Sequence, residues 1–242
     1  MAEDHFAGEV AEHYDADTAD LSDPRVLEPM VRFLAELASG GAALELAIGT
    51  GRVAIPLAAA GVAVSGIEFS PDMVAQLRAK RGGSDIAVTV GDMAAATMPG
   101  SFRLVYLVFN TIENLTSQDA QVACFCNAAA HLEPGGCFVV EVEVPQLRRL
   151  PPGETVRPFE VTAAHLGFDE FDPVNQGLVS HHYTFGDGGV RTLSVPFRYV
   201  WPGELDLMAR IAGMRLRERW GGWNREPFTA DSWKHVSVRE KA

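Results

Sequence analysis

Strand-like and helical segments alternate through the middle of the chain. The strand-like segments are short and mostly apolar, and they lie at residues 43–47, 62–69, 87–90, 104–109 and 137–144. Ala- and Leu-rich segments or glycine and proline turns connect them. Because consecutive parallel strands need a crossover connection, usually a helix, this order predicts a parallel sheet with helices on both faces.

The order changes after the fifth predicted strand. Residues 159–200 have no helical period and show alternating segments around Asp187-Gly188-Gly189, which predicts an antiparallel hairpin. A helix at 203–212 and strands at 215–220 and 235–239 then restore the α/β order. We therefore expect an α/β fold with a doubly wound, mostly parallel, seven-stranded sheet and an inserted antiparallel β layer.

These changes divide the chain into three regions. Residues 1–38 should form N-terminal covering helices. Residues 39–145 and 201–242 should form the main α/β domain, and residues 146–200 the inserted antiparallel subdomain. The inserted layer either covers the substrate or forms the surface of a homodimer.

The charge of the chain favours some partners over others. The 242 residues carry a formal net charge of −12, with a sequence pI near 5.0. Nucleic acid and anionic membranes are negatively charged and bind proteins through clustered Lys and Arg. Because this chain is acidic, we expect neither partner and favour a small-molecule substrate. An acidic N-terminus and only three cysteines favour a cytoplasmic protein. Cys124 and Cys126 have no neighbouring His, so no metal site is expected.

A glycine turn follows the first predicted strand. Gly49 and Gly51 precede a helix, and such a turn lets a ligand approach the backbone. Together with Ala54 the spacing also fits the dinucleotide fingerprint, and Glu68 could bind a ribose in either kind of enzyme. Glu45 before the glycines would repel a pyrophosphate but suits the ammonium of a methionine-like ligand.

Polar side chains end four of the predicted strands, namely Glu45, Glu68, Asp92 and Asn110. Ligands of doubly wound sheets bind beyond the carboxyl ends of the strands, so these side chains should share one site. Asp92 adds an acceptor for the exocyclic amine of adenine. This third acidic residue favours a nucleoside with a methionine-like portion over a dinucleotide.

Four ordered motifs resemble those of the class I S-adenosylmethionine-dependent methyltransferases. They are Glu45-Leu46-Ala47-Ile48-Gly49-Thr50-Gly51, Gly66-Ile67-Glu68-Phe69-Ser70-Pro71-Asp72-Met73, Gly91-Asp92-Met93 and Val108-Phe109-Asn110. The similarity spans residues 40–145 and implies a Rossmann-like domain with S-adenosyl-L-methionine as cofactor. Ala47 stands where the family usually has glycine.

The resemblance implies a role for each motif. Glu68 would hold both ribose hydroxyls, Met73 would pack on adenine, and Tyr14 would close over the methionine end. Arg52 could meet the carboxylate of the cofactor. The residues expected at the cofactor are Tyr14, Glu45, Ala47, Gly49, Gly51, Arg52, Glu68, Phe69, Met73, Asp92, Met93, Phe109 and Asn110.

The inserted β region and the segment 220–228 look like the substrate-covering parts of small-molecule and amino-sugar N-methyltransferases. This resemblance implies methyl transfer to N or O of a small molecule by in-line displacement, which needs alignment and exclusion of water. Candidate catalytic residues are His181, His182 and Asn110. The two histidines are adjacent on a predicted strand, so at most one faces the pocket. Candidate substrate residues are Glu113, Trp220 and Trp223.

Two other functions fit parts of the pattern. An NAD-dependent oxidoreductase would use the fingerprint formed by Gly49, Gly51 and Ala54. A non-catalytic nucleoside-binding module would keep the same fold without turnover.

Overall fold

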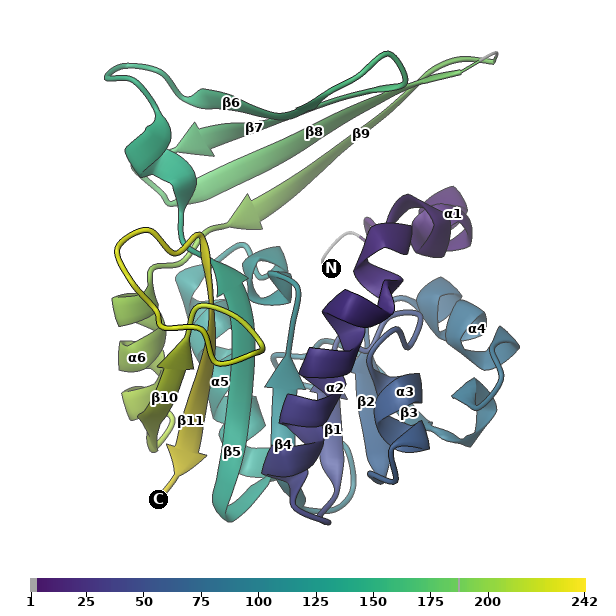
Figure 1. Ribbon diagram of the computed structural model, residues 1–242, viewed down its shortest axis with the longest axis vertical. Coiled ribbons are helices and arrows are strands. Elements are labelled where there is room, and N and C mark those ends of the chain that lie inside the picture. The colour runs from purple at the N-terminus through teal and green to yellow at the C-terminus, as the bar shows by residue number, and fades with distance from the viewer. Residues whose placement is uncertain (1–3, 187) are drawn as a thin grey trace.

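Two sheets build the protein. The computed structural model describes residues 4–186 and 188–242, so the predicted turn residue Asp187 lies outside the described residues. The larger sheet has seven strands in the order β10-β11-β5-β4-β1-β2-β3, and a separate sheet has the order β6-β7-β8-β9 (Figure 1). The predicted doubly wound, Rossmann-like α/β fold with an antiparallel insertion is confirmed.

The seven-stranded sheet is parallel except for β11. Strand β1 pairs in parallel with β2 and β4, β2 with β3, and β4 with β5, whereas β11 runs antiparallel to both β5 and β10. The order of the strands reverses between β1 and β4, which is where ligands of such sheets bind. The bounds are β1 Ala43–Leu46, β2 Val64–Glu68, β3 Ala87–Val90, β4 Phe102–Leu107, β5 Leu132–Glu143, β10 Met214–Trp220 and β11 Lys234–Lys241.

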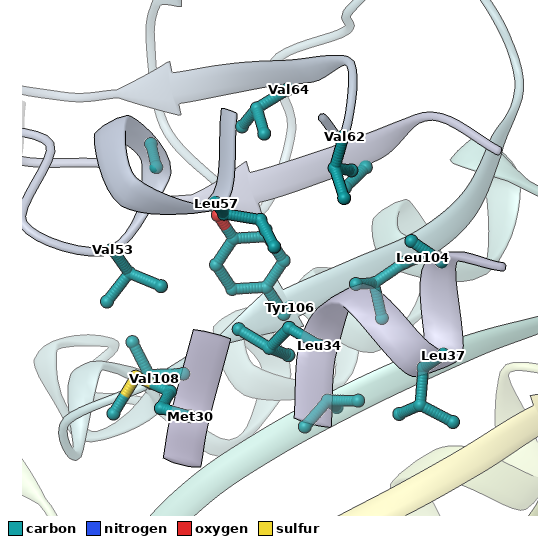
Figure 2. Packing of buried hydrophobic residues seen from close by; sticks show 14 of the residues in the cluster. Met30, Leu34, Leu37, Val53, Leu57, Val62, Val64, Leu104, Tyr106 and Val108 are labelled. Carbon is teal, nitrogen blue, oxygen red and sulfur yellow. The ribbon is translucent and has the colours of Figure 1, made fainter. Parts of the chain in front are cut away.

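Helices cover both faces of this sheet. Side chains that alternate along β4 pack in opposite directions: Leu104 and Tyr106 pack toward α2 and α3, and Val105 and Leu107 toward α5 and α6. Figure 2 shows the first of these two cores around Tyr106, Leu57 and Leu34. The helices are α2 Pro24–Ala38, α3 Ala54–Ala59, α4 Pro71–Ala79, α5 Gln118–His131 and α6 Pro202–Ile211.

Side-chain caps fix where several helices begin. Ser70 accepts a hydrogen bond from the amide of Met73 and so caps α4, as its sequence predicts. Asp23 caps α2, which continues through Pro29. A helix α1, Glu9–Asp17, and a short turn, Ala19–Ser22, precede it. Further short helical turns are Gly83–Asp85, Thr111–Asn114 and Gln146–Arg149.

The inserted sheet consists of β6 Val156–Val161, β7 His165–Asp172, β8 Gly177–Gly186 and β9 Gly189–Arg198. All of its pairs are antiparallel. It stands over the carboxyl edge of the parallel strands, with α1 beside it (Figure 1). The insertion therefore covers the edge at which the sequence predicts the ligand site.

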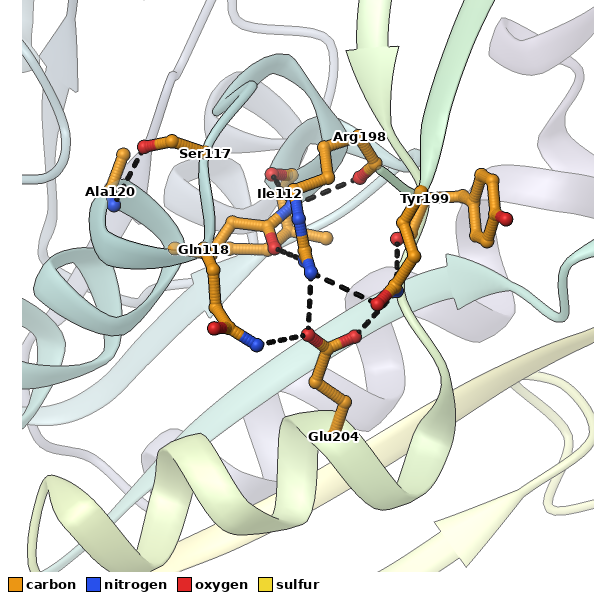
Figure 3. Close-up of polar contacts among 9 residues, drawn as sticks. Ile112, Ser117, Gln118, Ala120, Arg198, Tyr199 and Glu204 are labelled. Atoms are coloured by element: carbon orange, nitrogen blue, oxygen red, sulfur yellow. Dashed lines mark hydrogen bonds and ion pairs between the residues drawn. The ribbon is translucent and has the colours of Figure 1, made fainter. Parts of the chain in front are cut away.

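A buried polar network anchors the end of β9 to the main domain (Figure 3). Arg198 donates hydrogen bonds to Gln121, to Gln176 and to Glu204, the last at 2.8 Å. Gln118 and Gln176 also donate to Glu204, at 2.9 and 2.8 Å. Because Arg198 is only 6% exposed, the loss of its partners would leave an unpaired buried charge.

Among the described residues, no helix has the length and the apolar character that crossing a membrane requires.

Candidate cofactor and acceptor site

The turn after β1 has a left-handed backbone at three positions. Ala47, Gly49 and Gly51 have φ of 52°, 57° and 81°. A Cβ atom at Gly51 would lie 2.2 Å from Leu77 of α4, so only glycine fits there. Ala47 keeps the left-handed conformation at a cost of about 1–2 kcal/mol, which explains why glycine suits this position.

Backbone amides from both neighbouring loops hold Glu68 at the end of β2. Gly49 and Ser70 donate their N–H groups to its two carboxylate oxygens, at 2.7 and 2.9 Å. The amide of Phe69 adds a third backbone hydrogen bond to the carboxylate, which has about four acceptor sites in all. Burial raises the pKa of Glu68 above its ordinary value. This fixed carboxylate therefore suits a ribose diol.

Glu45, near the end of β1, has a strongly raised pKa. It is 4% exposed and accepts a hydrogen bond from the hydroxyl of Tyr106 at 2.9 Å. Burial raises the pKa of Glu45 to about 8, against the opposing effects of Tyr106 and Arg52. A buried carboxyl group of this kind gains most from a cationic partner, such as the ammonium of a methionine-like ligand.

The N-terminal segment fastens onto the glycine turn. Thr50 donates to Asp15 of α1 at 2.6 Å, and Lys80 donates to the carbonyl of Thr50 at 2.8 Å. Tyr14 is half-buried beside this contact. Burial raises the pKa of Tyr14, and the charges of Arg52, Glu68 and Glu45 also act on it. Tyr14 therefore lies where it was expected, near the β1 and β2 strand ends.

A second group of candidate cofactor residues lies at the ends of β2 and β3. The amide of Gly91 bonds to the carbonyl of Glu68 at 2.8 Å and so ties the two strand ends together. Asp92 is exposed, and its Oδ1 accepts from the amide of Ala94 at 2.8 Å. Met73 and Met93 are buried, whereas Phe69 remains 39% exposed. Apolar surface beside a free carboxylate oxygen fits an adenine ring and its amine.

The β4 end carries two further left-handed residues. Phe109 and Asn110 have φ of 57° and 58°, which is uncommon away from glycine. The guanidinium of Arg52 lies 5.4 Å from the centre of the Phe109 ring. Asn110 donates to Glu143 at 3.2 Å and accepts from the Glu143 amide at 2.8 Å. These bonds fix Asn110 to the end of β5, at the point where the strand order reverses.

A small cavity of about 70 Å³ opens beside Asn110 and Glu143. Trp233 and Lys234, which the sequence analysis missed, line it from the start of β11. Lys234 pairs with Glu141 at 2.7 Å. Because β11 runs antiparallel to β5, its first residues lie at the carboxyl edge of the parallel strands. An antiparallel last strand in the predicted sheet could therefore have indicated Trp233 and Lys234 as site residues. The complete lining is Leu21, Val26, Met30, Arg52, Phe109, Asn110, Glu141, Glu143, Trp233 and Lys234.

Two predicted substrate residues lie elsewhere. Trp223 is 6% exposed, packs edge-on against Phe33 and donates to Glu141 at 2.8 Å. Trp220 packs partly buried against the same core and donates to Glu218 at 3.0 Å. Both side chains pack against the protein and neither lines the cavity, so the structure gives no contact that supports a substrate role for Trp220 or Trp223. Trp233, 51% exposed, is the tryptophan that lines the cavity.

The third predicted substrate residue, Glu113, is buried rather than solvated, with 7% exposure. Burial raises its pKa well above the ordinary value, and the nearby charges of Glu143 and Asp169 raise it further. Burial is also the main cause of the raised pKa of Glu143 and of Asp169. The end of β5, the turn after β4 and strand β7 thus bring three carboxyl groups together.

His181 and His182 point to opposite faces of the inserted sheet. His182 shares its face with Ser180, whose Oγ lies 3.2 Å from Nε2 of His182. His181 stacks on Phe168 and bonds to Ser194 at 2.9 Å on the other face. His182 thus occupies the face toward α1 and the main domain and His181 the opposite face, so that of the two candidate catalytic histidines only His182 is on the side of the site.

The fold and the site define an α/β enzyme that binds a nucleoside cofactor at the carboxyl edge of its sheet. The profile of the methyltransferase domain family matches residues 43–136. The structure of the CcbJ methyltransferase from Streptomyces caelestis is 36% identical, with a TM-score of 0.88 and 100% of both chains covered. The chain belongs to the class I S-adenosylmethionine-dependent methyltransferases.

The names of two further relatives state what they methylate. The cypemycin N-terminal methyltransferase of a Streptomyces species is 27% identical over 209 residues, which are 84% of each chain. The dTDP-3-amino-3,6-dideoxy-alpha-D-glucopyranose N,N-dimethyltransferase of Streptomyces fradiae is 32% identical over 147 residues, 56% of this chain and 54% of the relative. All these relatives are methyltransferases, which favours this class over the oxidoreductase and the non-catalytic module.

Proposed function

We propose that the protein transfers a methyl group to the nitrogen of a basic amine in a small molecule. The observation that carries this proposal is the cavity at the ends of β4 and β5, where the Glu143 carboxyl group meets Asn110 beside Phe109, while the second acid, Glu141, is paired with Lys234. The names of the relatives support it, since one acts at an N-terminus and another on an amino sugar.

The cofactor, when bound, supplies an electrophilic methyl group on a sulfonium. The residues of the chain would then align the acceptor and hold its proton. Within this proposal the cofactor residues take the roles expected from the sequence: Glu68 at the ribose, Asp92 at adenine, and Glu45 with Arg52 at the methionine end. Tyr14 closes the site from α1.

The acceptor must reach the cofactor as a neutral amine, because an ammonium has no lone pair for displacement. Burial raises the pKa of Glu143, and so this carboxyl group is suited to take a proton from an ammonium near neutral pH. Glu141 is neutralised by Lys234 at 2.7 Å and suits this task less well. Trp233 lines the same cavity, with the Lys234 ammonium 5.0 Å from the centre of its ring.

Matched acceptors test the proposal. The enzyme is incubated with methyl-labelled S-adenosylmethionine and pairs of small molecules that differ only in an amine or a hydroxyl, such as an amino sugar and its parent sugar. We expect the label on nitrogen in the amines and little label in the hydroxyl partners. Preferential labelling of hydroxyls would contradict N-methylation.

A variant pair locates the acceptor. Glu143→Gln should raise the amine KM and lower kcat, whereas Glu154→Gln, an exposed carboxylate before β6, should change neither. An equal response of both variants would remove Glu143 from the site. The domain bounds at 38, 145 and 200, a homodimer and a cytoplasmic location remain predictions. Light scattering of the purified protein tests the dimer.

A further inference from the structure

One face of the inserted sheet is turned toward the main domain. Residues opposite each other in the strand register share a face, which places Asp169 and Ser180 together and His182 on the same side of β8. Arg191 of β9, from the same face, pairs with Asp17 of α1 at 3.4 Å. Ser180 is 8% exposed. We call this side, with Asp169, Ser180 and His182, the inner face.

Hydrogen bonds cross the inner face without a break. Ser180 bonds to Asp169, and its Oγ lies 3.2 Å from Nε2 of His182. Nδ1 of His182 lies 3.2 Å from Nε2 of His165, and the two rings stack with centroids 5.3 Å apart. Nδ1 of His165 then lies 3.0 Å from Glu160, whose side chain is 48% exposed. Every member can donate or accept a proton.

The inward end of this chain lies beside the acidic acceptor pocket. The charge of Asp169 raises the pKa of both Glu113 and Glu143. Glu143 itself lines the cavity with Asn110. The outward end, at Glu160, reaches the surface at the β6–β7 hairpin. The hydrogen-bonded groups thus lead from Asp169, whose charge acts on the pocket carboxyl groups, to solvent at Glu160, over strands β6, β7 and β8.

We propose that the inner face is a proton relay, in which Asp169, Ser180, His182 and His165 carry the proton displaced from the amine to the surface at Glu160. The inference rests on the proposed N-methylation, because an amine acceptor loses a proton for each methyl group that it gains.

The steps balance in protons and electrons. The amine gives its proton to Glu143, which passes it to Asp169. In the methyl transfer the bond between sulfur and carbon breaks with its electron pair on sulfur, while nitrogen bonds to the methyl carbon. Protonated Asp169 gives its proton to Oγ of Ser180, whose own proton passes to Nε2 of His182. His182 then gives its Nδ1 proton to Nε2 of His165, and His165 passes its Nδ1 proton to Glu160 or water. Rotation of the Ser180 hydroxyl and tautomerisation of the two imidazoles, each from Nε2–H back to Nδ1–H, reset the chain.

Charges around the relay favour a neutral His182. Burial lowers the pKa of His182, and the charge of His165 lowers it further, whereas Glu160 and Asp17 act in the opposite direction. Arg157 of β6 stabilises the anion of Asp169 at the inward end, as does His181. A neutral imidazole between two partners can accept on one nitrogen and donate from the other, as a relay requires.

Chemical rescue tests the role of His182, with Ser194→Ala as the control on the opposite face, where Ser194 is exposed. We expect His182→Ala to lower kcat for an amine acceptor about tenfold or more, and imidazole in the buffer to restore part of it. KM and the affinity for S-adenosylhomocysteine should stay within about twofold of wild type, since the relay does not hold the ligands. An unchanged kcat, an equal loss in Ser194→Ala, or no response to imidazole would overturn the relay.

A second measurement does not need turnover. Imidazole ¹⁵N NMR of the full-length protein reports which nitrogen of His182 carries the proton. Asp169→Asn changes the group that is hydrogen-bonded to Ser180 at the inward end, and we expect the tautomer ratio of His182 to shift. Unchanged His182 signals would overturn the relay. If wild type methylates no amine, N-methylation fails as the function, and this NMR result still decides the relay.

Discussion

Glu45 makes the binding of the cofactor depend on pH. Burial raises the pKa of Glu45 to about 8, so about nine tenths of the free protein carries a neutral Glu45 at pH 7. An ammonium at about 3 Å interacts with a carboxylate by roughly 5 kcal/mol at an effective dielectric constant of about 20, or about 4 pKa units. Binding should therefore return the pKa of Glu45 to near its ordinary value and release a proton.

The number of protons released follows from the pKa of Glu45 in the free and in the bound protein. At pH 7 the binding of S-adenosylhomocysteine should release about 0.9 proton, and its affinity should rise up to about tenfold per pH unit between pH 5.5 and 7.5. Calorimetry in buffers of different ionisation enthalpy measures the released proton directly. Glu45→Gln should abolish both effects. Proton release that is absent in wild type, or equal in Glu45→Gln, would refute the role assigned to this residue.

The raised pKa of Glu45 also makes the folding stability of the free protein depend on pH. The folded pKa of about 8 lies above the ordinary 4.5, so Glu45 stabilises the fold below pH 4.5. That contribution is lost as the pH rises through 8. Thermal unfolding of Glu45→Gln should therefore depend less on pH over this interval than that of wild type, and an equal dependence would contradict the raised pKa.

Three further predictions concern single side chains. Ala47→Gly should stabilise the protein by about 1 kcal/mol in urea unfolding, because φ of 52° disfavours alanine, and a loss of stability would contradict the left-handed turn. Arg198→Ala should lose about 3–5 kcal/mol, whereas Arg191→Ala, a more exposed pair, should lose less than about 1 kcal/mol; similar losses would argue against the β9 anchor. Trp233→Ala should raise the amine KM and leave the dissociation constant of S-adenosylhomocysteine unchanged, and weaker cofactor binding would place Trp233 outside the acceptor site.

Local patterns were sufficient to predict the main domain. The β3 bounds of Ala87–Val90 and the Ser70 cap follow from apolar periodicity and capping chemistry, which depend on neighbouring residues. The strand ends at Glu45, Glu68 and Asp92 follow for the same reason. Parallel strands bring their carboxyl ends to one edge, so a sequence pattern already implies a shared site.

The placement of several site residues depends on packing between segments far apart in the sequence, which local patterns do not predict. Trp223 lies near the end of the chain yet packs on Phe33 of α2, a contact that no local period reveals. Trp233 reaches the pocket only because β11 inserts beside β5. Glu113 is buried beside Glu143 and Asp169, residues far from it in the sequence, so its burial could not be read from the local pattern. Which histidine faces inward depends on the register of β8, and alternation alone leaves both choices open.

We expect the carboxyl edge of the parallel strands to bind S-adenosylmethionine through contacts of Glu68 with the ribose. The most direct measurement is a calorimetric cycle of wild type and Glu68→Gln with S-adenosylhomocysteine and its 2′,3′-dideoxy analogue. We expect wild type to prefer the hydroxylated ligand by about tenfold or more, and Glu68→Gln to lose most of this preference. No binding by wild type, or the same preference in both proteins, would show that Glu68 does not hold the ribose.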